Sequence, residues 1–126
     1  MLGRDDGRDS IEQWWEHAEQ KATLPMALSY GFFRTEGPTE LRTQHNKRAF
    51  HRFYMRKKAI VKRREAALGV YTKDVSRHGV GFLSPVQLMP RERIQLFLPS
   101  ADLSLQITRC RRVDRGCFEC GGTFVL

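Results

Sequence analysis

The sequence predicts a mainly β protein: a small antiparallel six-stranded β-barrel that carries an N-terminal helical extension. Three observations support this fold class. Short segments alternate apolar and polar residues, turn residues separate these segments, and no long helical pattern lies between them. The chain has 126 residues, of which 40% are hydrophobic, which suits one compact domain with an appendage rather than two domains.

The expected strands follow one another from the second half of a strongly basic stretch, residues 47–64. The first strand alternates Phe53, Met55, Ala59 and Val61 with basic residues, and this alternation predicts that Phe53 faces the core. Prolines and an Asp-Arg-Gly turn separate the later segments. These later strands are expected at about 67–73, 80–83, 94–98, 103–108 and 117–125.

Residues 1–45 are expected to form the N-terminal extension, and residues 46–126 the barrel domain. An amphipathic helix is predicted over about 10–22, because Ser10 begins a capping box and Pro25 follows the last helical repeat. Its apolar stripe is predicted to pack on the barrel or on its copy in a dimer, with a docking surface for a partner as the alternative. The conformation of residues 23–46 stays open. The stripe consists of Ile11, Trp14, Trp15, Ala18 and Ala22.

The net charge of +8 favours an anionic partner, which includes a nucleotide, a nucleic acid or an acidic protein surface. No apolar run approaches the roughly 20 residues that cross a bilayer, so membrane insertion is not expected. The N-terminus carries Asp5, Asp6 and Asp9 where a signal peptide has a basic start and an apolar core. We therefore expect a cytoplasmic protein.

The three cysteines predict packing groups rather than a disulfide framework or a metal site. Cys117 and Cys120 have the C-x-x-C spacing of half a zinc site, but residues an odd number apart on a strand point to opposite faces. Cys110 is the third cysteine, and an odd number without an export signal argues against paired disulfides. No nucleophile and base, phosphate-binding glycine loop or carboxylate pair occurs, so neither catalysis nor a cofactor is expected.

Two short motifs carry the recognition chemistry. Arg48 and Arg52 form an R-x-x-x-R pair, and Asp74, Ser76 and Gly79 form a D-x-S-x-x-G turn between two expected strands. The paired N–H donors of an arginine match the adjacent O6 and N7 acceptors of guanine, and they can also bond to a phosphate. A carboxylate accepts hydrogen bonds from guanine N1–H and from the exocyclic amine. Each motif also has a plainer interpretation, as a solvated basic face and as an Asp-x-Ser turn that bonds its own backbone.

Together, in this order, the two motifs resemble the PilZ domain, and the resemblance covers the chain from about His45 to Leu126. The ending Gly121-Gly122-Thr123-Phe124 also looks like the last strand of that family. PilZ domains are small antiparallel barrels that commonly bind the bacterial second messenger cyclic di-GMP. The resemblance implies ligand-binding roles for Arg48, Arg52, Asp74, Ser76 and Gly79, with Lys47 and Arg77 as further candidates.

The expected function is therefore that of a bacterial second-messenger receptor, which binds cyclic di-GMP and relays the signal to a protein effector through its N-terminal segment. The first alternative is an adaptor of the same fold that binds no nucleotide. The second is a small nucleic-acid-binding barrel, ranked last because Asp74 would repel a phosphate backbone and alternation buries Phe53. The sequence leaves open the effector, the ligand stoichiometry, a homodimer, and selectivity against cyclic dinucleotides that contain adenine.

Overall fold

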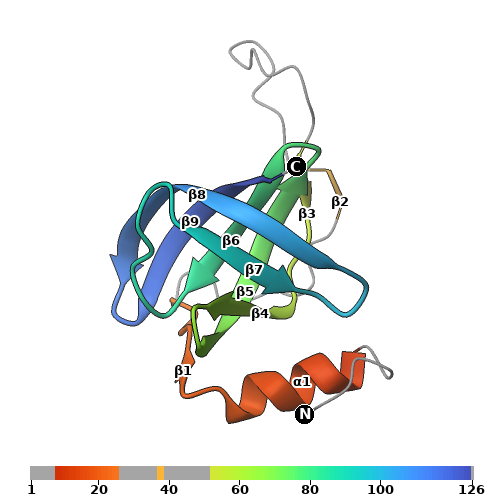
Figure 1. The fold of residues 1–126 in the computed structure, drawn as a ribbon, viewed down its shortest axis with the longest axis vertical. Helices are drawn as coiled ribbons and strands as arrows, with labels where there is room; N and C mark the ends of the chain where they lie inside the picture. Colours follow the sequence, from red (N-terminus) through yellow and green to blue (C-terminus); the bar gives the residue numbers. More distant parts are fainter. Residues whose placement is uncertain (1–7, 26–36, 39–51, 126) are drawn as a thin grey trace.

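The computed structural model of the protein describes residues 8–25, 37–38 and 52–125, which are mainly β (Figure 1). Helix α1 comes first and is followed by three short strands and then by six longer ones. The elements are α1 Arg8–His17, β1 Gln20–Lys21, β2 Gly37–Pro38, β3 Arg52–Tyr54, β4 Lys58–Arg63, β5 Ala66–Ser76, β6 Gly79–Ser84, β7 Arg93–Phe97, β8 Asp102–Asp114 and β9 Cys117–Phe124.

Strands β4 to β9 close into a barrel. Around the ring, β5 pairs with β4, β4 with β7, β7 with β8, β8 with β9, β9 with β6, and β6 with β5, all antiparallel. The predicted six-stranded antiparallel barrel is therefore confirmed. The three short strands lie outside this ring, since β1 and β3 pair with β5 and β2 pairs with β3.

Period-two alternation fills the barrel with apolar side chains. Phe82, Leu96, Leu105 and Ile107 are almost completely buried and belong to one core cluster. Cys120 lies in the same cluster. The side chain of Cys117, by contrast, packs outside the barrel against Leu83 and Ala22. This confirms that the two thiols of the C-x-x-C spacing face opposite sides of β9.

The predicted first strand is divided in the structure, and one side chain that was predicted to be buried is exposed. Residues 55–57 interrupt the strand between β3 and β4, and the backbone of Lys57 bonds to Thr72 across the break. Phe53 is 45% exposed rather than buried, because β3 lies outside the closed ring and the core does not enclose its faces. The expected burial of Phe53 was wrong, so it no longer argues against nucleic-acid binding.

Helix α1 is shorter than predicted. It begins at Arg8 and ends at His17 rather than spanning about 10–22. The chain after it turns into β1, which runs parallel to β5, and the backbone N–H of Ala22 donates to the carbonyl of Gly69 at 2.8 Å. These backbone hydrogen bonds to an exposed strand edge replace the last helical turns, so tertiary pairing outweighs the helical pattern. Ala22 is buried as expected, but in an extended segment.

The apolar stripe of α1 packs on the barrel, as predicted. Ile11 and Trp15 form a buried cluster with Ile60 of β4. The Trp15 indole Nε1–H donates to the carbonyl of Val70 on β5 at 2.9 Å, and the half-buried Trp14 ring contacts Phe97. The buried ring of Trp15 therefore fixes α1 against one end of the barrel (Figure 1). Within the described residues, no helix is long and apolar enough to cross a membrane.

Candidate functional site

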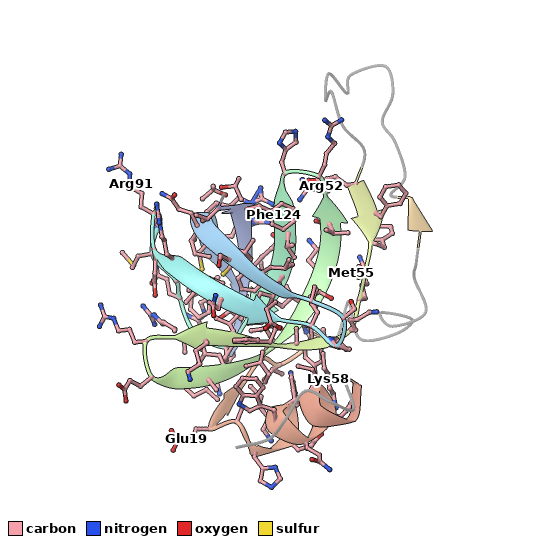
Figure 2. The ribbon with its side chains drawn as sticks, turned by 45° about the vertical axis from the view of Figure 1, so that its right-hand side comes forward. Glu19, Arg52, Met55, Lys58, Arg91 and Phe124 are labelled. Atoms are coloured by element: carbon pink, nitrogen blue, oxygen red, sulfur yellow. The ribbon has the colours of Figure 1, made fainter. Side chains whose placement is uncertain are left out.

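The D-x-S-x-x-G motif meets Arg52, the second arginine of the R-x-x-x-R motif, at the end of the barrel away from α1. Strand β3 pairs with the last residues of β5, so that Arg52 lies opposite Ser76 and Tyr54 lies opposite Asp74. Figure 2 shows Arg52 at this end, while Lys58 lies beside the helix at the other end. Strand β5 therefore spans the distance between the two ends, with Val70 under α1 and Asp74 at the candidate site.

An ion pair joins the two motifs. The guanidinium Nη2 of Arg52 donates to Asp74 Oδ1 at 2.9 Å, and the two side chains are 20% and 16% exposed. Charge-assisted hydrogen bonds of this kind are worth about 1.5–3 kcal/mol when both partners are held in place. The second arginine of the R-x-x-x-R motif and the aspartate of the D-x-S-x-x-G motif are thus brought together, across adjacent strands and 22 residues apart.

Ser76 and Gly79 shape the turn between β5 and β6. The Ser76 hydroxyl accepts a hydrogen bond from the backbone N–H of His78 at 3.2 Å, as in an ordinary serine turn. A Cβ atom added at Gly79 would collide with the carbonyl oxygen of Gly122 on the neighbouring strand. Glycine is therefore required at position 79 by the close approach of β9, and not by a positive φ angle.

A pocket of about 120 Å³ lies beside these residues. Arg52, Ser76 and Gly79 form one side, and residues of β8 and β9, including Arg109 and Gly121, form the other. The sequence analysis missed Arg109, because nothing in the order of residues shows that β8 passes beside the two motifs. The pair Gly121-Gly122 was the available signal, since adjacent glycines in a strand mark a place where another group approaches closely.

The remaining candidates divide into two groups. Lys47 and Arg48 fall in the segment 39–51, outside the described residues. Arg77 is exposed in the turn between β5 and β6. The structure therefore brings together Arg52, Asp74, Ser76 and Gly79.

A larger hollow, of about 490 Å³, lies over β4, β7 and β8 and is lined by Lys62, Arg64 and Arg93, among others. Its cations are all exposed, and none of them forms an ion pair with a carboxylate among the described residues. Such a surface attracts anions without selecting among them. The smaller pocket is the better candidate because Arg52, which lines it, is held in fixed geometry by the Asp74 carboxylate beside it.

The Arg52–Asp74 pair beside the smaller pocket has groups that can bind a ligand. A carboxylate paired with an arginine offers both hydrogen-bond acceptors and donors to the edge of a purine base. Among the residues that the structure describes, no group of three His, Cys, Asp or Glu side chains is placed to hold a metal ion.

Comparison with known proteins agrees with the fold and with the position of the motifs. The family model described as PilZ domain matches residues 46–125. No curated protein matches the chain. The matched segment covers both motifs and all six strands of the barrel, and the chain therefore belongs to the PilZ domain family.

Proposed function

We propose that this protein is a receptor for cyclic di-GMP that binds the nucleotide with Arg52, Asp74, Ser76 and Gly79. PilZ is a family of binding and adaptor domains, and cyclic di-GMP is its common ligand. The observation that supports the proposal is the Arg52–Asp74 ion pair, because it joins one residue of each motif. Arg48, with Lys47 and Arg77 as further cations, is proposed to complete the site.

The ion pair leaves both groups with capacity for a ligand. An arginine has five N–H donors, so Arg52 retains donors for guanine O6 and N7 or for a phosphate after it bonds to Asp74. An ionised carboxylate has about four acceptor positions, so Asp74 retains acceptors for guanine N1–H and the exocyclic amine. The pair also fixes the orientation of both side chains before the ligand arrives, which lowers the entropy cost of binding.

Calorimetric titration of the purified protein tests the proposal. The unchanged protein should bind cyclic di-GMP and should bind GTP and cyclic di-AMP much more weakly. Arg52→Ala should weaken binding by about a hundredfold or more, because it removes a bidentate charged contact. Arg112→Ala is the matched control, since Arg112 is an exposed arginine of β8 that does not line the pocket.

Two results would contradict this assignment. The first is the absence of cyclic di-GMP binding to the unchanged protein. The second is equal affinity of Arg52→Ala and Arg112→Ala, with unchanged circular dichroism in both variants. The second result would leave a nucleotide receptor whose site lies elsewhere, and the first would favour the adaptor without a nucleotide.

The relay to an effector is proposed to run through the N-terminal segment. Ligand binding would fix the position of Arg52 at the start of β3, and β2 (Gly37–Pro38) pairs directly with β3, so this part of the extension lies beside the proposed site. At the other end of the barrel, β5 accepts the hydrogen bond of Trp15 through Val70. Both connections offer a physical path by which ligand affinity can bias the position of the extension.

This relay has a direct spectroscopic test. Saturating cyclic di-GMP should change tryptophan fluorescence and slow amide exchange between about Pro38 and Phe53. If neither signal changes while calorimetry shows full occupancy, the relay is wrong and α1 is a passive cover for the barrel.

A further inference from the structure

Four strands place a carboxylate and a guanidinium on either side of two glycines. In the register of the sheet, Asp74 of β5 lies opposite Gly81 of β6, Gly81 lies opposite Gly121 of β9, and Gly121 lies opposite Arg109 of β8. The neighbours Val80 and Phe82 point into the barrel core, so this row faces outward. Its middle has no side chains, and its two ends carry opposite charges.

Both end residues lean over the glycines. A Cβ atom added at Gly81 would lie 2.9 Å from Asp74 Oδ1, and one added at Gly121 would lie 3.2 Å from Arg109 Nε and 3.4 Å from Cζ. The Arg109 side chain therefore lies along the surface of β9, with its guanidinium group over Gly121. Because Arg109 is exposed overall, the outer side of this planar group is open to a ligand.

The electrostatic surroundings of Arg109 differ from those of the next arginine on the same face. Arg111 donates two hydrogen bonds to Glu119 Oε1, at 3.2 and 3.0 Å, and Lys73 bonds to the same carboxylate. Within residues 8–25, 37–38 and 52–125, the side chain of Arg109 has no hydrogen-bond or ion-pair partner. It lines the same pocket as Arg52, so it brings an uncompensated positive charge to that pocket.

We propose that Arg109 is a further ligand-binding residue, whose guanidinium plane stacks on a guanine base held at its edge by Asp74. The inference rests on the proposed function, because the base in question belongs to cyclic di-GMP. A guanidinium is planar and weakly hydrated, and it stacks on aromatic rings. Glycine at positions 81 and 121 lets the Asp74 carboxylate and the Arg109 guanidinium lie close to the sheet, where a larger residue would crowd them.

Two substitutions separate stacking from simple charge attraction. Arg109→Ala removes both the plane and the charge, and it should weaken cyclic di-GMP binding by about tenfold or more, as expected when a stacking partner is lost. Arg109→Lys keeps the charge but removes the plane, so its affinity should fall about as far as that of Arg109→Ala. Arg112→Ala removes one arginine from the same strand outside the pocket and should stay within about twofold of the unchanged protein.

The results are read by calorimetry, with thermal unfolding of each variant as a check on the fold. Equal affinity of Arg109→Ala and Arg112→Ala would overturn the inference and leave the proposed function intact. Wild-type affinity of Arg109→Lys would show that only charge matters and would overturn the stacking contact. If the unchanged protein does not bind cyclic di-GMP, the proposed function fails and this inference fails with it.

Discussion

Asp74→Asn tests the proposed recognition of guanine by the Asp74 carboxylate, because it changes a single oxygen atom of that side chain to nitrogen. The new side chain has the same shape, but an NH₂ group replaces one of the two carboxylate oxygens and the charge is lost. In the structure, Asp74 Oδ1 accepts from Arg52 at 2.9 Å, and the side chain is 16% exposed. Asparagine keeps one oxygen for Arg52, so the local arrangement of β3 and β5 should survive.

The expected effect on stability is small, and the effect on affinity is large. A hydrogen bond to a charged group is worth about 1.5–3 kcal/mol and a neutral one about 0.5–1.5 kcal/mol, so the variant should lose about 1 kcal/mol of unfolding free energy. Toward guanine, however, the amide places a donor against the donors N1–H and N2–H₂. Losing one accepting oxygen and adding this opposed contact should cost about 2–3 kcal/mol, or about thirtyfold to a hundredfold in affinity.

Adenine should respond in the opposite direction. Its N6 amine donates and its N1 accepts, and an amide offers the complementary pair, so the preference for cyclic di-GMP over cyclic di-AMP should narrow. Calorimetry with both nucleotides measures the change, with Asp114→Asn at the distant end of β8 as the matched control. Wild-type affinity of Asp74→Asn for cyclic di-GMP would refute this reasoning and would show that Asp74 only shapes its turn.

Three further predictions concern stability. Burial alone would raise the pKa of Glu119, but Lys73 and Arg111 outweigh burial and hold that pKa below the ordinary value. Glu119→Gln should therefore lower the unfolding free energy by about 1 kcal/mol near pH 7. It should also remove the part of the stability that the protein loses between about pH 5 and pH 3 as Glu119 is protonated, which urea titration at each pH measures. Gly116→Ala should lower the unfolding free energy by about 1 kcal/mol or more, since Gly116 has φ 68°, and an unchanged unfolding midpoint would contradict this strain. Trp15→Phe should lower the unfolding free energy by about 1–3 kcal/mol, because it leaves the Val70 carbonyl of β5 without its buried donor. Trp14→Phe should lower it less, and equal losses in the two variants would show that the indole hydrogen bond is unimportant.

Much of the barrel could be predicted from the sequence because most of its strands bury one face, although β6 is buried along its whole length. Alternation of apolar and polar residues located β5 to β9, and turn residues such as those around Gly116 separated them. Alternation located the strands better than it located their ends. The strand expected at 103–108 extends to Asp114 as β8, because its later residues pair with β9 although they no longer alternate.

The errors arose where the partner of a segment decides its structure. The end of α1 and the extended path to Ala22 depend on the free edge of β5, and the exposure of Phe53 depends on β3 lying outside the ring. Likewise, Arg109 lines the pocket because β8 pairs with β9 and places Arg109 opposite Gly121. The motifs predicted the chemistry of the candidate site, and the pairing of distant strands supplies the opposite wall of its pocket.

The proposed site is tested most directly by locating the ligand on the barrel in solution. Proton–nitrogen spectra of the uniformly labelled protein, recorded during titration with cyclic di-GMP, report on each backbone amide separately. We expect the largest shifts at Gly79 and Gly121, which line the pocket beside Arg52, and at Gly81, which lies opposite Gly121 in the sheet. Shifts centred instead on Gln95 and Ser104, in the larger basic hollow, would contradict the proposed site.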